Sequence, residues 1–289
     1  MADYKIFTDS TCDVKKEILE EWGAGYFNLT FYFTDDEERQ YNDMDMPAAD
    51  FYREMRNGRI AKTAGTNIEI IKEAFRKELL LGNDILYLGF SSALSSTYNS
   101  GVIAAEELSE EFPERTIFCV DTLSQSAGQA MLLRLTLDQK EAGATLSEAR
   151  DYAESMKLKI AHWFSVDDLT YLERGGRLSK ASLVIATVLN IKPILHTDPE
   201  GKLVAVEKVR GRKKSIQSMI DKYGELAENP GSEPVYFRHS DAEENILYMK
   251  ELFREKYGIE PSMILDVGPV IGSHIGPGTV AIFYVAKER

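Results

Sequence analysis

The chain has 289 residues, 44% of them hydrophobic and 28% charged, which is the composition of an ordinary globular protein. Its 34 basic residues against 47 acidic ones leave a net charge of -13, which argues against general binding to nucleic acid or to anionic membranes. No apolar run is long enough to span a bilayer, no secretory signal is evident, and two cysteines make neither a disulfide framework nor a metal site, so we expect a cytoplasmic protein.

In the first half of the chain, short apolar runs alternate with helical patterns. The predicted strands are Tyr4–Thr8, Ile85–Phe90 and Thr116–Asp121, and the predicted helices are Val14–Trp22, Asn67–Leu80, Tyr98–Glu111 and Thr122–Ala142. This alternation predicts a mainly parallel sheet with helices on both faces, a three-layer α/β/α arrangement whose ligands bind at the carboxyl ends of the strands. Asp9, Ser10, Ser91 and Asp121 all fall at such ends.

The second half is richer in strands. The predicted strands are His162–Val166, Lys192–His196, Leu203–Val209, Pro234–Arg238, Met263–Val267 and Val280–Val285, and the predicted helices are Ser179–Leu189, Lys213–Ala227 and Ala242–Tyr257. The turn Asp198–Gly201 predicts a hairpin between the strands on either side of it. We therefore expect a two-layer α/β arrangement with a mixed or antiparallel sheet, and two domains that comprise residues 1–158 and 159–289.

A run of hydroxyl side chains, Ser91 to Tyr98, stands where a strand passes into a helix. The first-turn N–H groups of a helix have no intrahelical partner and favour an anion. Because the run contains no lysine or arginine, a carboxylate suits it better than a polyphosphate. Ordinary capping of the helix explains the same residues equally well.

Most catalytic motifs are missing from the chain, including the phosphate-binding and dinucleotide-binding glycine loops. The segment Gly89–Ala93 approaches a nucleophile elbow but lacks its final glycine. A small acyl hydrolase or transferase is the alternative from another functional class. Its nucleophile would be Ser91, Ser92 or Ser95, and its base would come from the histidines at positions 162, 196, 239 and 274.

Four segments in order carry a family resemblance. They are Phe7–Asp13, Lys62–Thr66, Tyr171–Ser179 and Gly272–Thr279. Together they resemble the DegV family of bacterial fatty-acid-binding proteins, which includes acyl carriers that work with a fatty acid kinase. The resemblance implies a two-part architecture with a ligand tunnel between the parts. It also implies a fatty acid as ligand and no cofactor.

The resemblance places the ligand carboxylate on Thr63 and Ser95, whose hydroxyls can each donate one hydrogen bond. Helix capping is again the alternative for both. The chain departs from the usual family pattern at Ser96 and at Thr66, so either can share the contact. His274 stands between glycines on an expected loop, where it can hydrogen-bond or neutralise a carboxylate.

Further contacts are expected from the same resemblance. Ser10, Arg174 and Arg177 are additional candidates for the head group or the mouth of the tunnel. Arg210 opens the one concentrated basic stretch of an acidic chain and is the candidate for docking the kinase. A solvated start of a helix is the alternative for that stretch.

With the resemblance, we expect a carrier that buries the tail of a long-chain fatty acid and does no covalent chemistry of its own. That it presents the carboxylate to a kinase for acyl-phosphate formation is implied by the resemblance alone. Burial of about sixteen carbons, at roughly 0.8 kcal/mol per methylene, makes the tail the main source of affinity. Chain length, unsaturation and oligomeric state stay open.

Overall fold

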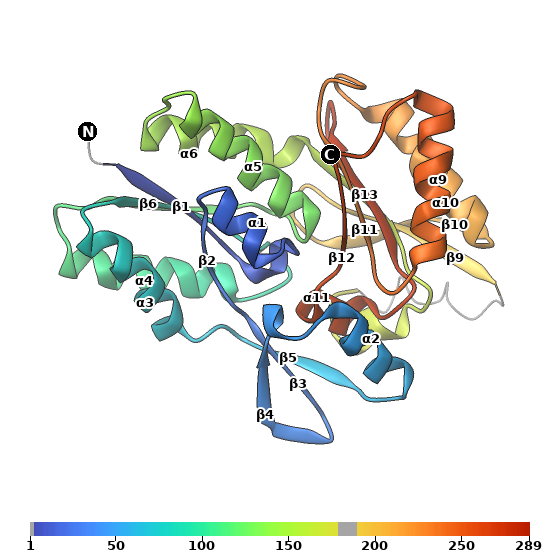
Figure 1. Cartoon of the computed structure of the whole chain (residues 1–289), viewed down its shortest axis with the longest axis horizontal. Coiled ribbons are helices and arrows are strands. Elements are labelled where there is room, and N and C mark those ends of the chain that lie inside the picture. Colours follow the sequence, from blue (N-terminus) through green and yellow to red (C-terminus); the bar gives the residue numbers. More distant parts are fainter. Residues whose placement is uncertain (1–2, 179–189) are drawn as a thin grey trace.

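The computed structural model describes residues 3–178 and 190–289 (Figure 1). The predicted helix Ser179–Leu189 lies outside the described residues. Three sheets organise the rest of the chain, and helices cover them. Among the described residues, no helix is long and apolar enough to cross a membrane.

The first sheet is parallel, as predicted. Its strands, in spatial order, are β2 (Gly25–Phe27), β1 (Tyr4–Asp9), β6 (Asp84–Gly89) and β7 (Ile117–Asp121). Helices α3 (Ile68–Leu80) and α4 (Thr97–Glu111) lie on one face, and α5 (Ala127–Glu141) and α6 (Leu146–Met156) on the other (Figure 1). Because both faces are covered, successive strand residues such as Leu86 and Tyr87 are both fully buried, in different apolar clusters. The three-layer expectation is confirmed.

Helix α5 begins five residues later than the predicted helix Thr122–Ala142, because the first residues of that range form a loop, and helix α6 was not predicted. Thr122 and Ser124 bond to backbone groups of this loop and of β6, which competes with helix formation. Leu123 and Ser126 adopt positive φ angles of 50° and 51°, which end any helical path there. Helix α6 starts separately at a capping box formed by Thr145 with a glutamate three residues later.

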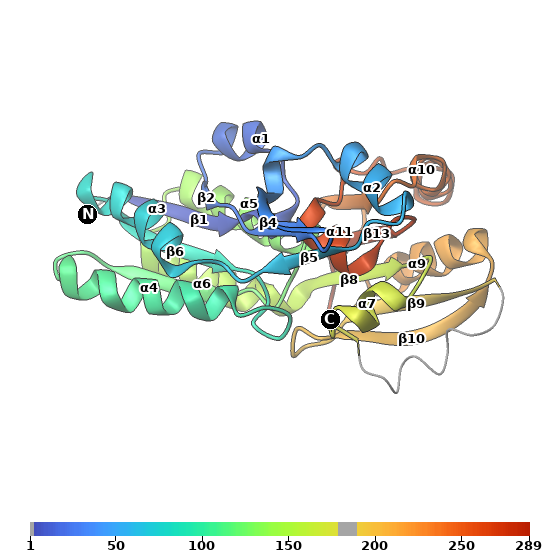
Figure 2. The same ribbon diagram turned by 90° about the horizontal axis from the view of Figure 1, so that it is seen from below.

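The second large sheet is mixed, as predicted. Its strands, in order, are β10 (Leu203–Arg210), β9 (Ile191–Thr197), β8 (Ile160–Ser165), β13 (Val280–Val285), β11 (Val235–His239) and β12 (Met263–Asp266). Helices α9 (Arg212–Leu226) and α10 (Glu243–Tyr257) cover one face, and α5 packs on the other. The predicted hairpin of β9 and β10 is present, with a bulge between Ala205 and Glu207, and it lies at one edge of the molecule (Figure 2).

A third, antiparallel sheet was not predicted. It consists of β4 (Asp36–Asn42), β3 (Thr30–Phe33) and β5 (Ala61–Ala64), and it projects from the body of the molecule (Figure 1). Strand β4 is polar and almost wholly exposed, so it carries no apolar alternation that would reveal a strand. The sheet matters for the candidate site because Thr63 lies on its strand β5 and does not cap the helix that follows.

Short helices complete the fold: α1 (Lys16–Glu21), α2 (Ala48–Arg56), α7 (Thr170–Arg174) and α11 (Pro269–Ile275). The prediction that His274 lies on a loop is wrong, because His274 lies in the last turn of helix α11. Pro269 starts this helix at a position where its missing N–H costs nothing, and Gly276 ends it at a φ of 69°. Although α11 comes late in the chain, it packs against α2 and β5 of the first half (Figures 1 and 2).

One cluster of buried apolar side chains runs from the parallel sheet through α5 to the mixed sheet. It joins Leu88 of β6 to Phe164 of β8 and Ile275 of α11. The boundary between residues 158 and 159 stays a prediction, since the core is shared by both sides of it.

Candidate functional site

A cavity of about 340 Å³ lies where the three sheets and α11 meet. This volume is in the range of roughly 300–1,000 Å³ typical of small-molecule sites. Its walls are mainly apolar, and the apolar side chains are Leu29, Phe90, Leu94, Phe164, Leu172, Leu203, Val267, Val270, Ile271, Ile275, Ala281 and Phe283. Such a wall suits a hydrocarbon chain.

The cavity brings together most of the side chains that the sequence singled out. Those that line it are Thr63, Ser95, Ser96, Arg174, Arg177 and His274. Two others do not line it. The Oγ of Ser10 is buried and accepts a hydrogen bond from the backbone N–H of Leu29 at 3.0 Å, and the Oγ1 of Thr66 lies 3.3 Å from that of Thr97.

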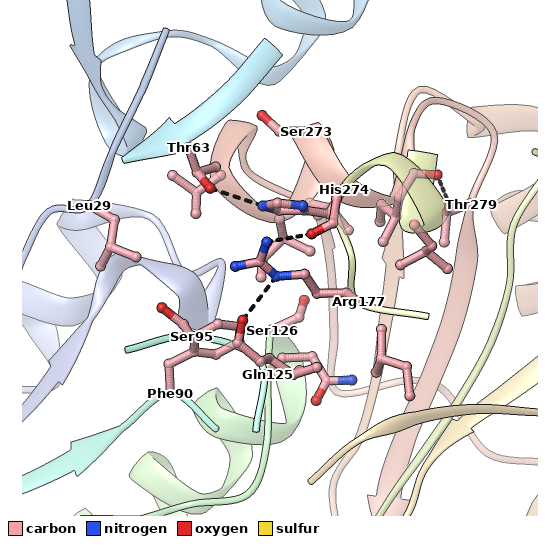
Figure 3. A pocket seen from close by; sticks show the side chains of 18 of the residues that line it. Leu29, Thr63, Phe90, Ser95, Gln125, Ser126, Arg177, Ser273, His274 and Thr279 are labelled. Atoms are coloured by element: carbon pink, nitrogen blue, oxygen red, sulfur yellow. Dashed lines mark hydrogen bonds between the residues drawn. The ribbon is translucent and has the colours of Figure 1, made fainter. Parts of the chain in front are cut away.

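His274 and Thr63 are joined directly (Figure 3). The Nε2 of His274 is 2.9 Å from the Oγ1 of Thr63, while its Nδ1 is buried without a partner in the described part of the chain. An unpaired buried N–H is more costly than an unpaired acceptor, so the proton belongs on Nε2. His274 then donates to Thr63, and the hydroxyl proton of Thr63 is free to point at a ligand oxygen.

The imidazole of His274 is uncharged at neutral pH. Burial, together with the positive charges of Arg177 and Arg174, lowers the pKa of His274 to about 4. Of the two roles expected for this histidine, hydrogen bonding therefore fits and neutralisation of a carboxylate does not. Positive charge at this end of the cavity comes from the arginines instead.

Arg177 crosses the cavity beside His274 (Figure 3). Its guanidinium donates to the backbone carbonyls of Leu94, at 3.0 Å, and of Gly175. No carboxylate of the described residues pairs with it within 4.0 Å, and burial lowers its pKa. Arg177 thus ties the loop that carries Ser95 to the end of α7, and it leaves its charge available to an anion.

Ser95, one residue before the N-cap of α4, bonds to the first N–H of the helix and also lines the cavity. Its Oγ accepts a hydrogen bond from the backbone N–H of Thr97 at 3.2 Å and lies 2.9 Å from the hydroxyl of the same residue. An oxygen that accepts these bonds can still donate its own proton to a ligand. Capping and ligand binding, which the sequence left as alternatives, are compatible at this residue.

The serines do not form a nucleophilic site. Within the described part of the chain, none of Ser91, Ser92 and Ser95 bonds to a histidine, and Ser91 donates to the carbonyl of Gly201 at 3.0 Å. The base that a serine hydrolase needs is therefore not in place.

All charged side chains that line the cavity are basic: Lys62, Arg174, Arg177 and Arg238. Of these, Lys62 and Arg174 are exposed, as is Ser96, so the polar end of the cavity is also its mouth. Basic lining in a chain of net charge -13 favours an anionic head group at this end.

Two buried aspartates hold α11 in place, a role that could not be predicted from the sequence. Asp13 accepts a hydrogen bond from the backbone N–H of Gly268 at 2.8 Å, and Asp43 accepts one from that of Val270 at 2.8 Å. Burial raises the pKa of Asp13 to about 7; burial and the nearby Asp13 raise that of Asp43 to about 8. These contacts cross from the first half of the chain to the helix that carries His274.

The buried aspartates predict a falling stability above neutrality. Up to their pKa values of about 7 and 8, Asp13 and Asp43 keep protons in the folded state that the unfolded state has already released, so the free energy of unfolding drops as the pH rises from 6.5 and levels off above about pH 8. His274 has the opposite slope, but only below the ordinary histidine pKa of about 6.5. We expect Asp43→Asn to remove up to about 1.4 kcal/mol of this loss per pH unit, measured by urea unfolding.

The matched control is Asp45→Asn, which changes an exposed aspartate of the same segment and should leave the slope unaltered. A parent protein whose stability is constant from pH 6.5 to 8 would contradict the assignment.

The fold and the cavity define a class of protein: an α/β protein of two large sheets and one small one, with an apolar cavity that is polar and basic at its mouth. The family model described as "Uncharacterised protein, DegV family" matches residues 3–287, and the chain belongs to the DegV family. The resemblance found in the sequence is thereby confirmed.

Similar proteins support this membership. A DegV domain-containing protein of Clostridium perfringens is 36% identical over 289 residues, covering 100% of this chain and 99% of the relative. A protein of Thermotoga maritima named fatty acid-binding protein is 32% identical, with coverage of 99% and 98%. The structure of a DegV family protein from Thermus thermophilus, described with fatty acid binding, has a TM-score of 0.88 at 27% identity, covering 99% of this chain and 100% of that one. These two relatives are described as binding proteins and not as enzymes.

Proposed function

We propose that this protein binds a long-chain fatty acid with its tail in the cavity and its carboxylate at the mouth, held by Thr63, Ser95 and the neutral His274 behind Thr63. We propose further that it presents this carboxylate to a fatty acid kinase for acyl-phosphate formation. The kinase uses ATP, which makes the cytoplasm the proposed compartment. The protein itself supplies no cofactor and no nucleophile.

The observation that carries the proposal is the polarity of one cavity. Its interior is lined by side chains such as Phe164 and Phe283, whereas hydroxyls, an imidazole and arginines gather at the mouth. A ligand that is apolar along most of its length and anionic at one end matches this distribution. The described relatives from Thermotoga maritima and Thermus thermophilus, which are named for fatty acid binding, support the same ligand class.

The tail and the head group of the fatty acid contribute differently to the free energy of binding. Burial of about sixteen carbons contributes on the order of 12 kcal/mol before the costs of association. Each charge-assisted hydrogen bond at the head adds about 1.5–3 kcal/mol. The tail therefore determines most of the affinity, and the hydroxyls determine which carboxylate oxygen faces the solvent and the partner.

Native mass spectrometry of protein purified from bacterial cells tests the proposal. We expect a mass increment that is lost on denaturation and recovered as an intact free fatty acid. A covalent adduct, formed when the protein is incubated with a reactive acyl ester, would instead support the serine-dependent alternative. Protein that neither carries nor takes up any fatty acid would refute the proposal.

Arg210 is the proposed contact with the kinase. It is the last residue of β10, pairs in register with Ile191, is exposed and does not line the cavity. Its neighbour Arg212 is engaged inside the molecule, where it donates to the carbonyl of Ser165 at 3.0 Å and pairs with Asp167. Of the two arginines, only Arg210 is therefore presented to a partner.

Arg210→Ala should leave the bound lipid in place but lower the rate of acyl-phosphate formation by a cognate kinase. Raising the concentration of the carrier should restore part of the rate, as expected when a charged docking contact is lost. The control is Arg53→Ala, which removes an exposed arginine of α2. A variant that loses its lipid, or that works at the parental rate, would rule out this docking surface.

A further inference from the structure

The cavity wall contains polar side chains that a plain hydrocarbon tail does not satisfy. Among the described residues, three have a buried polar side-chain atom without a hydrogen-bond partner and also line the cavity: His274, Gln125 and Arg238. His274 belongs to the head-group site. The other two lie elsewhere on the wall and have no role in the function proposed above.

Gln125 lies on the opposite side of Arg177 from Thr63 and His274 (Figure 3). Its side chain is only 7% exposed, and its Nε2 donates to the Oγ1 of Thr197 at 2.7 Å. Its Oε1 has no partner. If the amide is turned over, the hydroxyl of Thr197 donates instead and the NH2 group is left over, so either orientation leaves one amide atom unsatisfied.

Arg238 is fully buried, and its guanidinium is poorly satisfied. It donates to the carbonyl of Phe237 at 3.1 Å and to the thioether sulfur of Met263 at 3.6 Å, and its Nε has no partner. Burial lowers the pKa of Arg238 and the nearby Asp13 works against this effect, but no carboxylate of the described residues lies within 4.0 Å of the guanidinium. The unsatisfied Nε–H of Arg238 therefore fits a hydrogen-bond acceptor on the bound chain, and this acceptor is a neutral group because the carboxylate of the proposed ligand lies at the mouth.

The two residues flank one surface, the floor that the mixed sheet gives to the cavity. Across this sheet, Leu195, Phe164, Ala281 and Arg238 stand in register on four neighbouring strands, β9, β8, β13 and β11. Phe164 and Ala281 line the cavity between the two ends of the row. Gln125 is bound to β9 at one end, through Thr197, and Arg238 stands on β11 at the other.

Other hydroxyls on the wall do not share this property. Ser273 donates to the carbonyl of Pro269 at 2.7 Å, Ser126 bonds to Asp13, and Thr279 donates to the carbonyl of Ile275 at 3.4 Å. Their hydrogen-bonding capacity is used within the protein. Apart from His274 at the head-group site, the unsatisfied polar side-chain atoms of the described cavity wall therefore lie at the two ends of the floor.

We propose that the tail compartment accepts a fatty acid that carries a hydroxyl group on its chain, hydrogen-bonded to Gln125 or to Arg238. A hydroxyl both donates and accepts, so it can satisfy the amide oxygen of Gln125 as well as the Nε–H of Arg238. Burial of a hydroxyl against an apolar wall is unfavourable, whereas burial against an unsatisfied partner is not. This inference rests on the proposed function, because it names the substrate class of the same cavity.

The test compares the affinity of the delipidated protein for octadecanoic acid with that for a panel of monohydroxy-octadecanoic acids differing in the position of the hydroxyl. At least one isomer is expected to bind as tightly as octadecanoic acid or more tightly, whereas an apolar wall would weaken every isomer by about tenfold or more. In Gln125→Met or in Arg238→Lys, which keeps the charge opposite Asp13, that isomer should lose about tenfold while octadecanoic acid changes little.

Leu203→Met is the control, since it alters an apolar residue of the wall and should change the affinity for both kinds of acid equally. If octadecanoic acid binds but all isomers bind tenfold or more weakly, the inference is overturned and the proposed function stands. The inference is also overturned, and the proposed function stands, if neither variant changes the ratio of the affinities for hydroxylated and plain octadecanoic acid. That result would mean that a buried water alone satisfies Gln125 and Arg238. If no acid binds at all, the proposed function fails and this inference fails with it.

Discussion

Replacing Thr63 and Ser95 together by alanine is expected to weaken fatty-acid binding by about 30-fold or more, because two charge-assisted hydrogen bonds to the carboxylate are lost. The fold should survive. Thr63 lies on an edge strand of the small sheet, and the loss of the capping oxygen of Ser95 costs about 1 kcal/mol. Isothermal titration with a long-chain acid measures the effect, and urea unfolding measures the remaining stability.

The matched control is the pair Thr66→Ala and Ser92→Ala, which removes the same kinds of hydroxyl from the same two segments without touching the cavity wall. It should bind fatty acid about as well as the parent. Equal affinity of the Thr63 and Ser95 double variant and its parent would show that the carboxylate is held elsewhere.

Much of the fold could be predicted because most strands can be recognised in the sequence as short apolar runs. β6 and β13 are buried along their whole length or nearly so, and the expected positions are within one residue of the observed ones. β4 could not be predicted, because it is polar and exposed and exists through its pairing with β3. Although β3 directly precedes β4 in the chain, a strand that is polar on both faces shows no apolar alternation from which it could be recognised.

The candidate site also contains residues that could be predicted from the sequence and residues that could not. Thr63, Ser95 and His274 could be named from local motifs and from the family resemblance, and the structure puts them on one cavity wall. The roles of Asp13 and Asp43 could not, since each acts on a backbone N–H more than 200 residues away in the chain. The glycines around His274 suggested a loop, but Gly272 lies within helix α11. A glycine stands there because Tyr52 and Phe51 pack too closely to leave room for a side chain.

Gly175 gives the second large effect expected at the head-group site. A Cβ at this position would lie 2.3 Å from the Nδ1 of His274, too close for the imidazole to remain where it is. The backbone itself accepts alanine, since the φ of Gly175 is -72°. Gly175→Ala should therefore displace the imidazole from Thr63. The overpacking itself costs about 1–3 kcal/mol of folding stability. Loss of the hydrogen bond that orients Thr63 should weaken fatty-acid binding by about tenfold.

Two further variants separate this clash from a general effect on the loop. Gly176→Ala adds a methyl group at the adjacent residue, where no atom lies within 4 Å of the new Cβ. Only the positive φ of 70° is unfavourable for alanine, so this variant should bind fatty acid more nearly as the parent does. In a His274→Ala background, Gly175→Ala should cause no further loss, because the atom it strikes is gone. The carboxyl resonance of a fatty acid labelled with carbon-13 at C1 reports the head-group environment in each variant. If Gly175→Ala leaves that resonance and the affinity unchanged, the imidazole does not support the carboxylate site from the position that the structure gives it.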